Sequence, residues 1–90
     1  MRLYVAGQTP KSIAAVANLR RICDEYLAGR YRIDVIDLVA RPHLARKDQI
    51  LVIPTLIRRL PPPLRKIVGD LSRGDRVLVG LDLHPDDPEA

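Results

Sequence analysis

Apolar and polar positions near the start of the chain predict a strand followed by an amphipathic helix. Residues 3–7 form a short apolar run that ends at a glycine, which is typical of a strand. From Thr9 to about Ala28, apolar residues recur every three or four positions, which predicts a helix. Thr9 fits its N-cap, Pro10 its first position and Gly29 its C-terminal stop. The apolar stripe of this helix comprises Val16, Leu19, Cys23, Tyr26 and Leu27.

The following segments predict a second strand and a short helix. Residues 31–38 begin with alternating apolar and polar side chains, which predicts a strand with one wet face, as at a sheet edge. Residues 41–47 predict a short helix with Leu44 and Ala45 facing inward. Two strands flanking a helix indicate a parallel pair joined by a right-handed crossover.

The second half of the chain, residues 50–83, is apolar enough to be core, but its local signals conflict. With a period of two, alternate residues from Val77 to Leu83 share one face, as in a strand. With a period of 3.6, Val77, Leu78 and Leu81 cluster on one side, as in a helix. The pattern leaves both interpretations open.

A possible capping box bears on that choice. Ser72, with Asp75 three residues later, resembles a helix start, whereas Gly80 weakens either element. If residues 55–59 and 64–68 form a hairpin and residues 71–82 a last helix, the element order is βαβαββα. That is the α/β thioredoxin-like order, with a mixed sheet.

Prolines interrupt this half at two places. Pro54 follows an apolar run, so it fits a strand start, an edge or a bend. Residues 61–63 are three consecutive prolines, and each X-Pro bond can be cis at modest cost. These prolines either act as a slow conformational switch through cis/trans isomerisation or only shape a tight turn and a strand edge. In the thioredoxin-like fold the proline before the third strand is cis, and Pro54 occupies the matching place.

Composition limits the domain to one aliphatic core. The chain has 90 residues, of which 47% are apolar, with no Phe and no Trp. We expect one domain over residues 1–83 and a mobile acidic tail over residues 84–90. The formal net charge is +4, but only three tyrosines are available for stacking on bases and no long basic run occurs. Nucleic-acid binding is therefore not expected.

The side chains that could do chemistry are few. Cys23 is the single cysteine, which excludes an internal disulfide and a cysteine-based zinc site. His43 lacks a ligand partner at metal-binding spacing, and Asp34 and Asp37 would point to opposite faces of a strand. We therefore expect no enzyme activity, no metal and no cofactor. No apolar run approaches the roughly 18 residues that span a bilayer, and no secretory signal is evident, so we expect a cytoplasmic protein.

A redox role is the alternative that the fold order raises. A redox thioredoxin carries Cys-x-x-Cys at the start of its first helix, where the helix dipole lowers a thiol pKa. Here that place reads Gln-Thr-Pro-Lys over residues 8–11, which disfavours disulfide exchange. Glutathione binding through the backbone beside Pro54 stays open.

Several blocks together resemble one family. They are Leu3-Tyr4-Val5-Ala6-Gly7-x-Thr9-Pro10, Val35-Ile36-Asp37-Leu38, Ile50-Leu51-x-x-Pro54-Thr55-Leu56, the stretch from Leu60 through the three prolines to Ser72, and Val77-Leu78-x-Gly80-Leu81-Asp82-Leu83. This pattern is similar to the KaiB family of circadian clock proteins, in one gapless register over residues 3–83. The resemblance implies a metamorphic protein. Such proteins exchange a KaiB-type ground fold, often tetrameric, for a monomeric thioredoxin-like fold by rearranging the second half.

The resemblance also implies a role without chemistry of its own. The thioredoxin-like state would bind the N-terminal ATPase ring of a KaiC-like hexamer and then recruit or displace a KaiA-type protein or a sensor kinase with a KaiB-like domain. The implied fold-switch residues are Pro54, Pro61, Pro62, Pro63, Gly80 and Asp82. The implied partner-binding residues are Arg32, Asp34, His43, Lys47 and Asp48.

Two departures from the family pattern matter. Arg32 and Asp34 stand where the family often has a small residue and a lysine, which inverts the local charge and bears against a KaiA-type partner. That change is consistent with a clock or another timer that lacks a KaiA-type protein.

Replacing Gly80 by Ala is expected to favour the helix over residues 72–83, because alanine is about 1 kcal/mol better in a helix interior.

Overall fold

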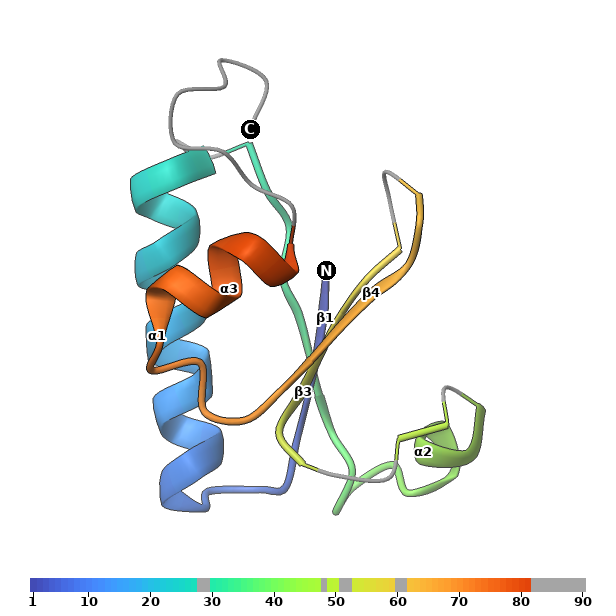
Figure 1. The fold of residues 1–90 in the computed structure, drawn as a ribbon. Coiled ribbons are helices and arrows are strands. Elements are labelled where there is room, and N and C mark those ends of the chain that lie inside the picture. Colours follow the sequence, from blue (N-terminus) through green and yellow to red (C-terminus); the bar gives the residue numbers. More distant parts are fainter. Residues whose placement is uncertain (28–29, 48, 51–52, 60–61, 82–90) are drawn as a thin grey trace.

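The computed structural model describes residues 1–27, 30–47, 49–50, 53–59 and 62–81, which follow the order βαβαββα (Figure 1). The elements are β1 (Arg2–Val5), α1 (Pro10–Leu27), β2 (Asp34–Asp37), α2 (His43–Lys47), β3 (Thr55–Arg58), β4 (Arg65–Val68) and α3 (Gly74–Gly80). The predicted thioredoxin-like order is confirmed, and the alternative arrangement of the second half is not the one observed. The end of the domain at residue 83 and the tail over residues 84–90 lie outside the described residues and stay predictions.

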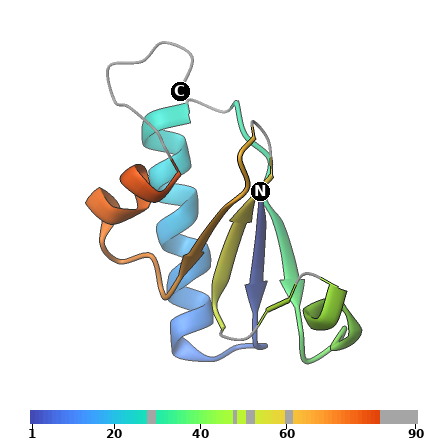
Figure 2. The same cartoon turned by 45° about the vertical axis from the view of Figure 1, so that its right-hand side comes forward.

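The four strands form one mixed sheet in the order β2-β1-β3-β4 (Figure 2). β1 pairs with β2 in parallel and with β3 antiparallel, and β3 pairs with β4 antiparallel. The parallel pair and the hairpin were both predicted from the sequence. β2 and β4 are therefore the two edges of the sheet.

Helices cover the two faces of this sheet unequally (Figures 1 and 2). Leu3 and Val5 of β1 and Leu56 of β3 pack in a core with buried residues of α1 and α3. Tyr4 and Ile57 point to the opposite face, where the short helix α2 contributes Leu44 and Ala45. Alternation of side chains along the central strands thus separates a large core from a small one.

The observed stripe of α1 is rotated slightly from the predicted one. Leu19, Cys23 and Leu27 are buried as predicted, whereas Val16 and Tyr26 are only partly buried. The helix also buries Ser12, Ala15 and Ile22, which the spacing argument omitted. Ser12 and Ala15 continue the spacing of three and four residues that Leu19, Cys23 and Leu27 follow, so they belong to the same buried side of the helix.

The start of α1 matches its predicted cap. The Thr9 hydroxyl oxygen accepts the backbone N–H of Ser12 at 3.4 Å, and the Thr9 hydroxyl donates to Ser12 Oγ at 2.8 Å. Ser12 Oγ also accepts the N–H of Ala6 at 3.0 Å, which ties the helix to the end of β1. The predicted helix end at positions 28 and 29 lies outside the described residues. None of the helices in the described part of the chain is long and apolar enough to cross a bilayer.

The second strand is shorter than predicted, because its partner is short. β2 covers Asp34–Asp37 rather than residues 31–38. Its four residues pair one to one with Arg2–Val5, so no strand remains beside residues 31 and 32.

In the second half, tertiary contacts select the helical interpretation. Val77 and Leu81 are almost completely buried, whereas Val79 is 79% exposed, which a strand face holding all three would not allow. The predicted capping box is wrong. Asp70 Oδ1 instead accepts the Ser72 N–H at 3.0 Å, and the helix starts later, after Arg73, with no side-chain cap.

The first test concerns the larger core. Leu19→Ala is expected to lower the free energy of unfolding by about 2–5 kcal/mol, because it leaves a cavity at a fully buried position between α1 and the sheet. Urea unfolding measures the loss. Ile13→Ala, on the same helix but 52% exposed, should cost well under half as much. Equal costs for both variants would contradict the described orientation of α1.

Candidate functional site

Two of the predicted partner-binding residues lie together at the start of the edge strand β2, where Asp34 is the first strand residue and Arg32 precedes it. Arg32 Nε donates to Asp34 Oδ1 at 3.3 Å, and both side chains are well exposed. The Arg32 carbonyl accepts the N-terminal ammonium at 2.8 Å, and the Asp34 N–H donates to the Met1 carbonyl at 2.9 Å. Such an exposed pair adds little stability, so its charges are available to a partner.

The remaining partner-binding residues form a separate group. His43 and Lys47 are the first and last residues of α2, and both are exposed. α2 follows the C-terminal end of β2, whereas Arg32 and Asp34 lie at its start (Figure 1). The structure therefore places the predicted residues at opposite ends of the edge strand rather than in one cluster. Asp48 lies outside the described residues.

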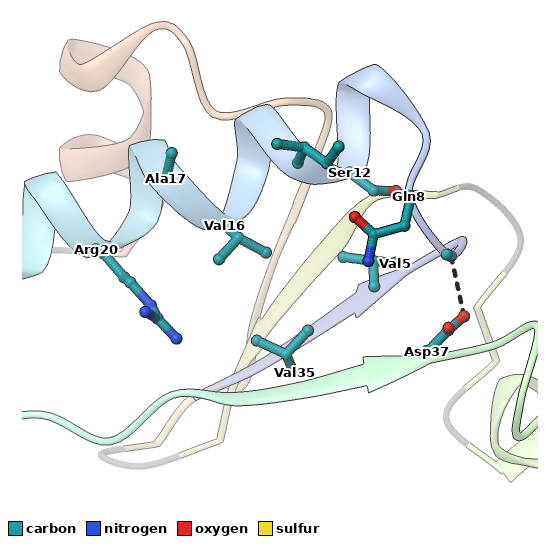
Figure 3. Close-up of a pocket in the computed structure, with 10 residues that line it drawn as sticks. Val5, Gln8, Ser12, Val16, Ala17, Arg20, Val35 and Asp37 are labelled. Atoms are coloured by element: carbon teal, nitrogen blue, oxygen red, sulfur yellow. Dashed lines mark hydrogen bonds between the residues drawn. The ribbon is translucent and has the colours of Figure 1, made fainter.

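Between α1 and the edge strand β2 lies an apolar groove of about 550 Å³. Figure 3 shows Val16 and Arg20 of α1 and Val35 of β2 facing this groove. Val35 and Ile13, which both line it, are 41% and 52% exposed. Its other lining residues are Val5, Gly7, Gln8, Ser12, Ala17 and Asp37.

Two side-chain oxygens in the groove wall, those of Asp37 and Ser12, have protein partners. Asp37 Oδ1 accepts the backbone N–H of Gly7 at 2.9 Å (Figure 3) and that of Val39 at 2.9 Å. Ser12 Oγ is held by Ala6 and Thr9. Because these groups serve the fold, the groove offers a surface for binding rather than a set of reactive side chains.

The predicted switch residues surround the β3–β4 hairpin. Pro54 is buried just before β3, its preceding peptide bond is cis as the thioredoxin-like fold predicts, and its carbonyl accepts the Gly69 N–H at 2.9 Å. Pro62 and Pro63 are exposed in the turn at the other end, with a cis bond between them. Pro61 and Asp82 lie outside the described residues. The switching role of these residues stays a prediction.

Gly80 ends α3 directly above β4. A Cβ built on Gly80 would lie 2.8 Å from Cδ1 and 3.0 Å from Cγ1 of Ile67. Ile67 is only half-buried, so the end of its side chain can rotate away. The glycine thus permits close packing of helix and strand.

Sequence reasoning missed two side chains that connect the halves of the chain. Asn18 of α1 donates from Nδ2 to the Asp70 carbonyl at 2.8 Å, which ties α1 to the loop before α3. Arg58 of β3 is 92% buried and donates from Nη1 to the Leu81 carbonyl. No local signal identifies either residue, because both bonds join segments more than 20 residues apart.

Two acidic residues, Asp70 before α3 and Asp75 in its first turn, accept local hydrogen bonds. Hydrogen bonds from the side chain and backbone of Ser72 lower the pKa of Asp70 below its ordinary value. The pKa of Asp75 is lowered by the Arg76 backbone and by nearby Arg73. Both carboxylates remain charged at neutral pH and act as local hydrogen-bond acceptors.

The single thiol lies in the core rather than at a reactive surface. Cys23 is completely buried in α1, and burial, with a smaller contribution from the charge of Asp24, raises its pKa from 9.0 to about 11. A neutral buried thiol is a poor nucleophile. Among the residues that the structure describes, no three His, Cys, Asp or Glu side chains gather so as to hold a metal ion.

Comparison with known proteins agrees with the pattern of blocks. The KaiB domain matches residues 2–83. The chain is 52% identical over 83 residues to the "Circadian clock oscillator protein KaiB" of Microcystis aeruginosa, covering 92% of this chain and 80% of that protein. It is 45% identical over 86 residues to the "Circadian clock protein KaiB3" of Synechocystis sp., covering 96% of this chain and 84% of that protein. It is also 49% identical to the KaiB1 protein of the same organism, over 97% of this chain and 83% of that protein.

Burial of Cys23 predicts a specific pH dependence. The unfolded thiol ionises near its ordinary pKa and the folded thiol only near 11, so stability is retained below pH 9 and falls as the pH rises from 9 to 11. The fall is at most about 1.4 kcal/mol per pH unit. Urea unfolding between pH 8 and 11 measures it, and Cys23→Ala should show a smaller decline. Rapid alkylation of the native protein at pH 8 would contradict the buried position.

Contact between Gly80 and Ile67 predicts coupling between the two positions. Gly80→Ala should stabilise the described arrangement by at most about 1 kcal/mol. The stabilisation should be larger with Val at position 67 than with Ile67, because Ile67→Val removes the closest clash. A double-mutant cycle of urea unfolding measures the coupling.

Gly74→Ala is the matched control for this cycle. Gly74 begins the same helix, and a Cβ built there meets nothing within 4 Å. Its effect should therefore be the same with Ile67 or Val at position 67. Coupling of equal size between positions 74 and 67 would contradict the explanation that the Gly80 effect arises from contact with Ile67.

Proposed function

The chain belongs to the KaiB family, and on that premise we propose that it is a non-enzymatic component of a circadian clock or related timer. In this proposal its thioredoxin-like state binds the N-terminal ATPase ring of a KaiC-like hexamer in the cytoplasm and regulates the phosphorylation cycle of that protein. The observation that carries the proposal is a thioredoxin-like fold in a KaiB-family chain that has no Cys-x-x-Cys.

Surface features support a role in binding. The start of β2 presents the exposed Arg32–Asp34 pair, and the groove beside it exposes Val35 and Ile13. A sheet edge can accept a partner's chain, and apolar side chains beside it add contact area. We assign the start of β2 to recruitment of a further protein, either a sensor kinase with a KaiB-like domain or a KaiA-type protein. His43 and Lys47 then serve as a second contact at the far end of the edge.

The second half supports a proposal of fold switching. Its last segment has apolar residues that satisfy a helical and a strand period, and α3 has only seven residues. A helix this short depends on tertiary packing rather than on its own propensity. We propose that residues 50–83 repack in a ground state that is a dimer or tetramer, and that ring binding selects the thioredoxin-like state.

A redox function has weaker support. Positions 8–11, where redox thioredoxins have their cysteine pair, contain no cysteine. Cys23 lies far along α1 and is buried with a raised pKa. Activity in an insulin-reduction assay would revive that alternative.

The decisive experiment mixes the full chain with a KaiC-like hexamer. Size-exclusion chromatography with ATP should show co-elution with the ring, and replacement of ATP by ADP should change the bound fraction. Unchanged elution in either nucleotide would contradict ring binding.

Reversal of the edge charges separates recruitment from ring binding. Arg32→Glu with Asp34→Lys should leave co-elution with the ring intact and should weaken capture of the third protein at least tenfold, because the exposed pair faces that partner. Titration of the preformed ring complex with the third protein measures the change. Lys11→Glu, on the exposed face of α1, is the control for a general charge effect.

A further inference from the structure

Arg58 occupies an unusual position for an arginine. It is the last residue of β3, every residue of that strand is buried, and only 8% of Arg58 is exposed. Arginine is rarely buried unless its guanidinium is paired. Its neighbour Arg59 is exposed, so two adjacent arginines have opposite environments.

The guanidinium of Arg58 reaches the end of α3. Nη1 donates to the carbonyl of Leu81, the residue that caps the C-terminus of that helix. The last carbonyls of a helix lack partners within the helix, and a cation there also opposes the negative end of the helix dipole. Arg58 therefore supplies both a donor and a charge to the same helix end.

The two ends of α3 are held unequally. At its start, Arg73 makes no side-chain capping bond, and the helix has only seven residues. At its end, Gly80 allows close contact with Ile67 of β4, and Leu81 is fully buried. Val77 anchors the middle of α3 in the larger core, and the contacts around the carbonyl that Arg58 binds seat its C-terminal end.

We propose that Arg58 is the positioning residue that seats α3 on the sheet and so sets the population of the thioredoxin-like state. Without the guanidinium, the Leu81 carbonyl loses its donor inside the core. Helix α3 then opens while β1, β2 and α1, which pair and pack with one another through other residues, stay packed. Because the effect is local, it differs from a general loss of stability.

Residue-resolved hydrogen exchange on the free protein tests this role. Arg58→Met keeps the length of the side chain and removes the donors. It should lower protection of the Val77 and Leu81 amides, which bond within α3, at least tenfold, or about 1.4 kcal/mol. Protection of the Leu19 and Cys23 amides of α1 should be unchanged. Arg59→Met is the matched control, and Arg58→Lys, which keeps the charge, should restore part of the loss.

Two results would overturn the proposal. One is equal protection of α3 in the Arg58→Met and Arg59→Met variants. The other is an equal loss in α1 and α3, which would indicate a general structural role. If Arg58→Met does not fold, Arg58→Gln carries the same comparison, and a loss confined to α3 is still required.

A second measurement, which rests on the proposed function, follows binding of the same variants to the KaiC-like ring. A ligand that binds only a minor state has its apparent affinity reduced by the population of that state. Arg58→Met should therefore slow association with the ring at least tenfold and leave the dissociation rate unchanged, whereas Arg59→Met should change neither. Faster dissociation instead would mean that position 58 contacts the ring. If exchange responds as expected but native protein does not bind the ring, the proposed function fails and the role of Arg58 remains.

Discussion

Burial of β1 between two strands is the constraint on which the rest of this fold depends. The strand has four residues and pairs with β2 on one side and β3 on the other. Leu3 and Tyr4 are completely buried, and they point to opposite faces. Both cores are therefore built on one short strand, and its length also limits β2 to four paired residues.

The second half of the chain is attached to this centre through β3 and α3. The hairpin of β3 and β4 continues the sheet, and Pro54 and Gly69 close one end of it through a backbone hydrogen bond. Helix α3 then packs against the larger core through Val77 and Leu81. Helix α3 has only seven residues, and the pairing of β1 with β2 involves none of them.

The same distribution of contacts separates the binding surfaces from the core. Polar oxygens beside the groove, such as those of Ser12 and Asp37, stabilise the turn between β1 and α1. Cys23 is held neutral in the core. Among the described residues, the outer edge of β2 offers a partner exposed charges with an apolar groove beside them. Recognition by shape and charge fits this surface better than reaction chemistry does.

Local sequence pattern was sufficient to predict the βαβα order of the first half, the cap at Thr9 and the parallel pair, and it was compatible with the hairpin, because each depends on neighbouring residues or on one period. It was also sufficient to place Pro54 before β3, whereas of Arg32 and Asp34 only Asp34 lies within β2. It did not place His43 and Lys47 at the opposite end of that strand from Arg32, because the separation depends on where β2 ends against β1.

Only the tertiary structure decided between helix and strand at residues 74–80. Both periods fit the sequence there, and the choice follows from burying Val77 and Leu81 while Val79 stays in water. The same holds for Arg58, which sequence places beside an equivalent arginine. Its guanidinium reaches the Leu81 carbonyl, 23 positions later in the chain, only because the intervening segment folds back. Periodicity indicates which side chains of a segment can be buried together. The contacts that select one secondary structure or one hydrogen-bond partner come from segments distant in the sequence.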